Sequence, residues 1–197
     1  MSETIPPVKS IYGNFWYRFV AVIIDAIVLG IAAFIIGIPL GIMFAGDMLQ
    51  MQLASSAVSL LLYLVYGSLT ESSGWQGTIG KKVLNLKVTN LEGDALSFSE
   101  AMVRNMVKYW ANFVIVIVPY ISDLKPFVPD PNGDPSEIFG KMFGTPYMMM
   151  TLSVGLVSTI GYLIAAFTAR RQALHDIIAK TAVLTTKTKS AGTDDEW

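Results

Sequence analysis

The stretch RFVAVIIDAIVLG, residues 18–30, places a cation and an anion at the start of a long apolar run. Asp25 is the only charged residue between Phe19 and Ala45. On an α-helix, a step of seven residues rises about 10 Å and returns to nearly the same face, so Arg18 and Asp25 share one stripe. A charged side chain near the bilayer centre costs about 2.5–3.5 kcal/mol on insertion scales. We therefore expect Asp25 to face protein, a cavity or a partner rather than lipid.

The composition also indicates a membrane protein. Hydrophobic residues make up 53% of the 197 residues, charged residues only 15%, and the mean hydropathy is +0.52. A helix needs roughly 20 apolar residues to cross about 30 Å of hydrocarbon. The apolar runs predict an all-α membrane protein with four transmembrane helices, at about 17–44, 48–70, 102–122 and 144–169.

The third of these spans rests on a short apolar run. It becomes long enough only when the helix is extended back to residue 102, which brings Arg104 and Lys108 into it. Long basic side chains can reach the membrane surface while their stems stay in apolar surroundings. We therefore expect Arg104 and Lys108 to extend to the cytoplasmic surface, with Tyr109 and Trp110 in the interfacial aromatic belt.

The distribution of basic residues orients the bundle, because cytoplasmic loops retain an excess of Lys and Arg. With both termini in the cytoplasm, only Lys125 and Lys141 lie outside. The other twelve of the 14 basic residues are then cytoplasmic: Lys9, Arg18, Lys81, Lys82, Lys87, Arg104, Lys108, Arg170, Arg171, Lys180, Lys187 and Lys189. The sequence predicts a single membrane domain over 1–197, with a cytoplasmic loop over 71–101 and a Pro-rich external loop over 123–143.

Short regular elements are expected on the cytoplasmic side. In LNLKVT, residues 84–89, apolar and polar side chains alternate with the period of a strand. Residues 181–185 are also rich in β-formers and emerge on the same side, so we expect the two segments to pair as a small cytoplasmic β-hairpin. Residues 170–181 are predicted to form an interfacial C-terminal helix.

Several functional classes find no support. The absence of cysteine excludes disulfides and thiol chemistry, and one histidine cannot build a metal site without several carboxylates. A net charge of −1 gives no case for nucleic-acid binding. GWQGTIGKK, residues 74–82, lacks the first glycine and the final Ser or Thr of a phosphate loop, and hydrolase motifs are missing. We expect neither an enzyme nor a bound cofactor.

Arg18, Asp25 and Asp176 form the candidate site. Drawn as a helix, the segment around Asp176 is apolar on one side and polar on the other. If it folds back beneath the bundle, Asp176 reaches Arg18, whose five donors can satisfy two carboxylates. Other roles stay open: Arg18 as an interfacial anchor, Asp25 as a polar contact between helices, and Asp176 on a solvated face. His175 is expected at the surface.

A second set of polar residues follows the predicted second span. Ser55, Ser59 and Tyr63 recur every four residues and so share a helix face. They could line a polar path, or they could hydrogen-bond to a neighbouring helix. Ser59 and Tyr63 are secondary candidates, together with Arg104.

Three sequence blocks resemble the RDD family of prokaryotic membrane proteins. They are RFVAVIIDAIVL, GTIGKKVLNLKVTNLEGDALSFSEAMVRN and RRQALHDIIAKTAVL. The arginine and two aspartates for which the family is named match Arg18, Asp25 and Asp176. The resemblance implies an integral protein of the prokaryotic cell membrane with a proposed role in transport, although the long external loop departs from the family pattern.

Two functions of different classes follow. In the first, the protein transports a small solute or ion, for example by cation/proton exchange, with Asp25 as the binding carboxylate and Arg18 with Asp176 as a cytoplasmic gate. Four spans leave little room for a solute, so transport would favour a homo-oligomer in the lipid bilayer. In the second, it is a non-transporting scaffold whose charges are a structural lock and whose loop over 74–96 docks a partner. A polar cavity reaching Asp25 favours the first function, and a dry, tightly paired Asp25 favours the second.

Overall fold

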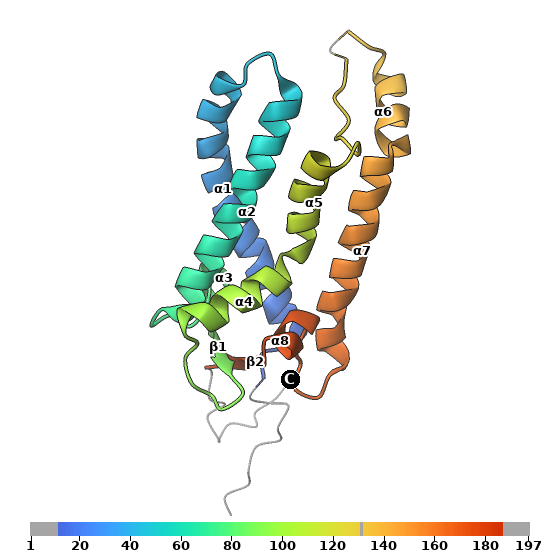
Figure 1. Cartoon of the computed structure of the whole chain (residues 1–197). Helices are drawn as coiled ribbons and strands as arrows, with labels where there is room; N and C mark the ends of the chain where they lie inside the picture. The colour runs from blue at the N-terminus through green and yellow to red at the C-terminus, as the bar shows by residue number, and fades with distance from the viewer. Residues whose placement is uncertain (1–11, 131, 187–197) are drawn as a thin grey trace, which may run out of the picture.

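Long apolar helices joined by short connections form the body of the molecule (Figure 1). The computed structural model describes residues 12–130 and 132–186. The two termini therefore lie outside the described residues, together with three of the basic residues assigned to the cytoplasm, Lys9, Lys187 and Lys189.

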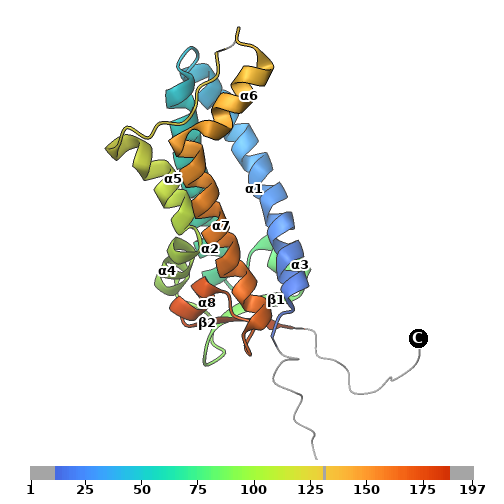
Figure 2. The same cartoon turned by 90° about the vertical axis from the view of Figure 1, so that its right-hand side faces the viewer.

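Three helices in the described chain are long and apolar enough to cross a membrane: α1 (Phe15–Met43), α2 (Met48–Ser72) and α7 (Pro146–Phe167). They run along the long axis of the molecule (Figures 1 and 2). A tight turn joins α1 to α2, and Gly46 in this turn has a φ of 97°, a conformation that glycine adopts without strain. These helices account for the first, second and fourth predicted spans.

The third predicted span is broken into two helices, α4 (Phe98–Lys108) and α5 (Trp110–Ile121), which are bent by 66° at Tyr109. α4 lies across the bundle rather than along it (Figure 1). α5 has 12 residues, or about 18 Å of helix, which is too short to cross about 30 Å of hydrocarbon. Residues 12–130 and 132–186 therefore contain three candidate spans, or four if the bent pair is one broken span.

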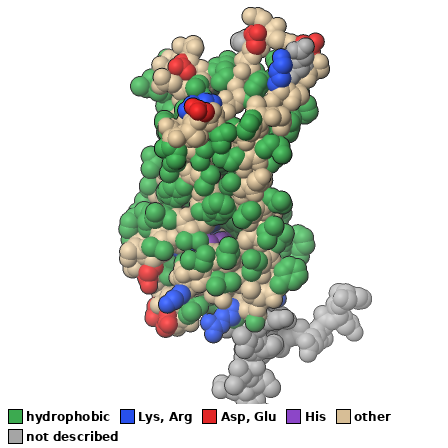
Figure 3. Space-filling view, turned by 45° about the vertical axis from the view of Figure 1, so that its right-hand side comes forward, with side chains coloured by type: hydrophobic (Ala, Val, Ile, Leu, Met, Phe, Trp, Pro, Cys, Tyr) green, Lys and Arg blue, Asp and Glu red, His purple; other side chains and the backbone are tan. Residues whose placement is uncertain are grey.

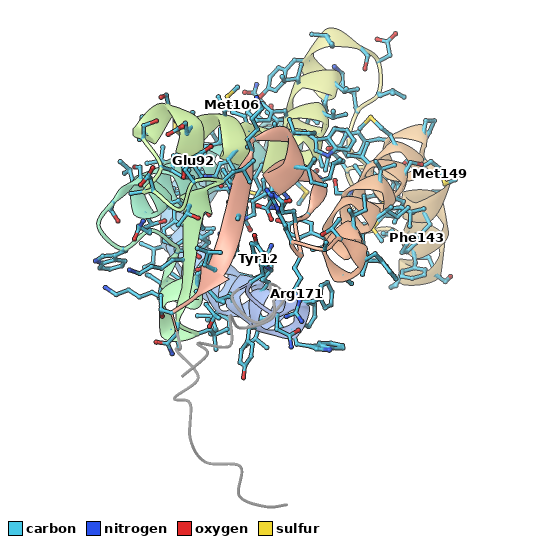
Figure 4. The ribbon with its side chains drawn as sticks, turned by 90° about the horizontal axis from the view of Figure 1, so that it is seen from below. Tyr12, Glu92, Met106, Phe143, Met149 and Arg171 are labelled. Atoms are coloured by element: carbon cyan, nitrogen blue, oxygen red, sulfur yellow. The ribbon has the colours of Figure 1, made fainter. Side chains whose placement is uncertain are left out.

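Two strands form a small sheet at one end of the molecule, which we call the sheet end. β1 (Leu86–Asn90) pairs antiparallel with β2 (Thr181–Thr185), as predicted. The pair is not a β-hairpin, because five helices lie between the two strands in the chain. Tyr12 adds an isolated bridge to Leu184, on the side of β2 away from β1 (Figure 4).

The buried core lies at the sheet end, where two five-residue helices, α3 (Ile79–Val83) and α8 (Leu174–Ile178), pack against α1 and α4. The predicted interfacial helix over 170–181 is thus reduced to α8. The core residues are Ala21, Leu86, Val88, Leu96, Ala101 and Val183.

Away from the sheet end, the large apolar side chains of the spans are exposed. Phe34, Ile35 and Ile38 on α1 are examples, each more than half exposed. Apolar side chains cover the middle of the molecule and charged ones gather at its two ends (Figure 3). An exposed apolar surface of this extent fits a multi-pass membrane protein whose middle contacts lipid.

The predicted external loop over 123–143 contains a helix of its own. α6 (Pro135–Gly144) starts at Asp134, whose side chain accepts a hydrogen bond from the amide of Ser136. Proline at the first helical position is favourable there, because its missing N–H has no partner in a helix. The loop is therefore less irregular than its prolines indicated.

Candidate functional site

Arg18 and Asp176 meet at the sheet end, as the sequence predicted for these two residues. Arg18 Nη1 donates to Asp176 Oδ2 at 2.8 Å. The same guanidinium donates to the main-chain carbonyls of Gly13 and Val183, each at 3.3 Å. Only 12% of the Arg18 side chain is exposed. Arg18 is thus a buried side chain that links α1 to α8 and β2, rather than an anchor at the membrane surface.

Asp176 is completely buried because α8 turns its polar side inward. Its Oδ1 accepts hydrogen bonds from Arg104 Nη2 at 2.6 Å and Nε at 3.1 Å. Burial favours a raised pKa for Asp176, but the charges of Arg104 and Arg18 outweigh it and hold the pKa well below its usual range. The carboxylate is therefore ionised. The opposite side of α8 exposes apolar residues, namely Leu174, Ile177 and Ile178.

Glu71, at the end of α2, is the second buried carboxylate of the site. Arg104 Nη1 donates to both of its oxygens at 2.7 Å, and Lys81 Nζ donates to Oε1 at 2.5 Å. Asn105 Nδ2 donates to Oε2 at 3.1 Å. Arg104, which is only 1% exposed, therefore bridges two carboxylates and does not extend to the surface as expected.

Together these side chains form what we call the ion-pair network: Arg18, Asp176, Arg104, Glu71 and Lys81. The network joins α1, α8, α4, α2 and α3, so every charge in it links two elements. It contains three cations and two carboxylates, which leaves one positive charge. Burial lowers the pKa of Lys81 to about 8, although Glu71 opposes the shift.

Glu71 and Lys81 were not among the site residues that the sequence suggested. Glu71 ends an apolar run and Lys81 follows in a polar stretch. Charged residues of a solvent-exposed loop occur in the same sequence context. One signal was available: an acidic residue beside a span, with a basic residue ten positions later.

Asp25 does not join the ion-pair network. Its Oδ1 accepts hydrogen bonds from Tyr66 Oη at 2.7 Å and from the amide of Gly80 at 2.8 Å, and its Oδ2 accepts one from Thr78 Oγ1 at 2.5 Å. The predicted cluster of Arg18, Asp25 and Asp176 therefore forms without Asp25. The physical reason is distance, since seven helical residues separate the two positions on α1 by about 10 Å.

Asp25 instead caps the start of α3, where free amides need an acceptor. α3 lies so close to α1 that a Cβ added to Gly80 would come within 2.1 Å of the carbonyl oxygen of Ala21. Only glycine allows this approach. Asp25 is 8% exposed and both of its oxygens have donors, so it is dry and tightly paired.

Of the secondary candidates, Arg104 belongs to the ion-pair network, whereas Ser59 and Tyr63 lie farther from the sheet end. Tyr63 stacks on Tyr109, with ring centroids 5.0 Å apart and planes at 32°. Ser59 lines a cavity of about 540 Å³ between α2 and α5, which we call the outer pocket. The polar side chains of the outer pocket carry no charge: Gln52, Ser55, Ser56, Ser59 and Asn112.

His175 is buried rather than at the surface, so that expectation is wrong. It packs on the ring of Tyr162 at 5.0 Å between centroids, and its Nε2 lies 3.4 Å from Asp176 Oδ1. Burial lowers the pKa of His175 to about 3 even beside Asp176, so the imidazole is neutral at pH 7. It adds no charge to the site.

A bundle of apolar helices, joined at one end by buried ion pairs and a two-stranded sheet, defines a multi-pass membrane protein with a buried network of charges. Residues 12–180 match the sequence profile of the RDD family, and the chain belongs to that family. It is 24% identical over 188 residues to the uncharacterized protein YxaI of Bacillus subtilis (strain 168), which covers 87% of this chain and 95% of the relative. No solved structure gives a significant match.

Proposed function

We propose that the protein moves a small solute or ion across the cell membrane, with the sheet end and both termini in the cytoplasm. The observation that supports this most is the outer pocket. Five of its eleven lining residues carry hydroxyl or amide groups, and such polar side chains are costly beside a membrane span unless something polar uses them. Its neutral oxygens suit a small polar solute or a partly hydrated cation.

The path through the outer pocket ends in the middle of the bundle, at the stacked rings of Tyr63 and Tyr109. Ser59, in the wall of the outer pocket, lies one helical turn before Tyr63. Asn112, also in the wall, lies close to Tyr109, because its main-chain N–H donates to the main-chain carbonyl of Tyr109 at 2.9 Å. In the proposal the tyrosine pair closes the pocket. The ion-pair network then acts as the cytoplasmic gate, whose opening requires ion pairs to separate.

Asp25 has a supporting role in this proposal rather than the role of a cation or proton site. A cation could bind its carboxylate only after Thr78, Tyr66 and the amide of Gly80 had released it. That carboxylate fixes α3, and α3 carries Lys81 into the ion-pair network.

The dry pairing of Asp25 also favours the second candidate function, a non-transporting scaffold or accessory protein. Among the described residues, the buried carboxylates are Asp25, Glu71 and Asp176, and each accepts hydrogen bonds from donors of this chain. In that case the charges hold the loop over 74–96 in one shape for a protein partner. The two functions make different demands on the outer pocket: transport requires it, and a scaffold does not.

Flux through liposomes separates them. Ser59→Ile narrows the outer pocket without removing a hydrogen bond that the described residues make. Ser153→Ile, on the exposed face of α7, is the control for the added side chain, and it removes only the hydrogen bond from Ser153 Oγ to the main-chain carbonyl of Met149. Proteoliposomes containing a trapped pH-sensitive dye are given sodium and proton gradients. We expect wild type and Ser153→Ile to exceed empty liposomes and Ser59→Ile to fall towards them. Equal flux in Ser59→Ile and Ser153→Ile, or none in wild type, would overturn transport of these ions.

A further inference from the structure

Two cavities adjoin at the sheet end, on the side facing α7. The first has a volume of about 180 Å³ and is lined by four basic side chains: Arg18, Lys81, Arg104 and Lys108. We call it the cationic cavity. Its lining includes no carboxylate, because Glu71 and Asp176 lie behind the guanidinium and ammonium groups that they pair with.

The cationic cavity keeps an excess of positive charge. The ion-pair network leaves one cation unbalanced, and Lys108 adds a second. Within the described residues Lys108 forms no ion pair or hydrogen bond, and its ammonium lies over the ring of Tyr109, 4.8 Å from the centroid. Two unbalanced positive charges at a partly buried site favour an anionic ligand.

The second cavity, which we call the apolar groove, has a volume of about 480 Å³ and lies between α4, α7 and α8. It shares Lys108, Tyr162 and His175 with the cationic cavity, so the two cavities adjoin at these side chains. Its apolar walls include Met106, Trp110, Val157, Leu174 and Ile178.

The apolar groove opens on the surface that faces lipid. Met106, Val157 and Ile178 are each about half exposed, and Figure 4 shows Met106 on the outer side of α4. On the other side of the cationic cavity, Phe19 and Val22 of α1 line its wall and are also about half exposed. A molecule could therefore enter sideways from the bilayer.

One buried polar atom near the junction has no hydrogen-bond partner within the described residues. Ser158 Oγ lines the apolar groove and is buried without a hydrogen bond. Buried polar groups normally have partners, so this hydroxyl is an observation in favour of a polar group bound beside it.

We propose that the protein binds an anionic phospholipid from the leaflet at the sheet end, with its phosphate in the cationic cavity and an acyl chain in the apolar groove. A soluble anion would use the charges but leave the groove empty, and a zwitterionic lipid would place its own cation among four others. This binding does not depend on whether the protein transports a solute. The lipid joins α1 to α7 across the network and so stabilises the folded bundle.

Lipid binding to the detergent-purified chain tests the proposal. Native mass spectrometry and melting temperature are measured with dioleoyl phosphatidylglycerol, with dioleoyl phosphatidylcholine and with sodium phosphate alone. We expect phosphatidylglycerol to bind and raise the melting temperature, and the other two to have little effect. Lys108→Gln should weaken phosphatidylglycerol binding about tenfold, the effect of one lost charge-assisted hydrogen bond. Lys87→Gln, which removes an exposed lysine from β1, should not.

The apolar groove needs its own variant. Val157→Trp fills the groove and should weaken phosphatidylglycerol binding, whereas Val65→Trp, at an exposed position on α2, should not. If Lys108→Gln and Lys87→Gln bound phosphatidylglycerol equally well, the cationic cavity would not be the binding site. Equal binding of phosphatidylcholine would overturn the charge argument. Competition by phosphate together with unchanged binding by Val157→Trp would identify a free-anion site and overturn the lipid. Because the readout is binding, a negative flux assay leaves these outcomes unaffected.

Discussion

Replacing Glu71 with glutamine should expose how strongly the ion-pair network holds the sheet end together. Glu71 is completely buried and holds Arg104 at 2.7 Å and Lys81 at 2.5 Å. Arg104 keeps Asp176 as a second partner. Within the described residues, Lys81 has no other carboxylate, so the variant leaves a buried ammonium without an anion.

Removing one partner of a buried ion pair costs about 3–5 kcal/mol. Lys81 limits the loss, because burial already lowers its pKa to about 8 and it can release its proton once Glu71 is gone. We therefore expect a loss of about 3 kcal/mol in the free energy of unfolding at pH 7, the lower end of that range.

The loss should shrink as the pH rises from 7 to 9. An unfolded lysine has a pKa of about 10.4, so over this range the unfolded chain stays protonated while the folded chain gives up the Lys81 proton. Stability from this group therefore rises with pH. In the variant Glu71 no longer raises the pKa of Lys81, so this pKa falls further below 8. The folded variant therefore gives up the Lys81 proton at lower pH than wild type does. Between pH 7 and 9 its free energy of unfolding then rises more steeply than that of wild type, and the difference between the two shrinks.

Unfolding in mixed dodecylmaltoside and SDS micelles at the two pH values measures this. Adding Lys81→Met to Glu71→Gln should recover part of the loss, because the unpaired cation is removed. Glu92→Gln, at an exposed turn, should change the free energy by less than about 0.5 kcal/mol. A loss below about 1 kcal/mol for Glu71→Gln, the size expected of an exposed pair, would refute the reasoning. So would a double variant less stable than the single one.

Three further substitutions test the other contacts by thermal unfolding in detergent. Gly80→Ala should cost about 1–3 kcal/mol, because the new methyl group meets the main chain of α1, whereas Gly37→Ala points into open space and should be neutral or stabilising; equal effects would contradict the close approach. Asp25→Asn should cost about 1–3 kcal/mol, since an amide nitrogen must then face a donor, and unchanged stability would argue against the capping role. Arg18→Lys should lower the melting temperature, because an ammonium cannot keep Asp176 and both main-chain carbonyls together; full stability in this variant would show that charge alone suffices.

The sequence was most informative where a single period dominates. Apolar runs predicted α1, α2 and α7, and strand alternation predicted that β1 pairs with β2. Hydropathy could not reveal the 66° bend at Tyr109, because composition alone does not distinguish a straight span from a broken one of equal length. The predicted third span therefore corresponds to a bent pair of helices rather than to one straight helix.

The candidate site was only partly predictable because its partners come from distant parts of the chain. The contact between Arg18 and Asp176 followed from the expected topology and the resemblance. The partners of Asp25 did not, since they depend on how closely α3 approaches α1, and that approach rests on the missing side chain of Gly80. Arg104 was read as a surface cation because its position beside an apolar run fits that role equally well.

The position of Asp176 near the end of the chain has a consequence for biogenesis. Arg18, Glu71 and Arg104 are synthesised and inserted well before α8 and β2 emerge from the ribosome. During that interval Arg104 can pair with Glu71, but Asp176, the carboxylate that pairs with Arg18, has not yet been made. The last short helix and strand therefore complete the charge pairing, and a chain that stops before residue 174 retains an unmatched arginine at the membrane surface. Such a chain would be distinguishable to quality-control proteases from a finished one.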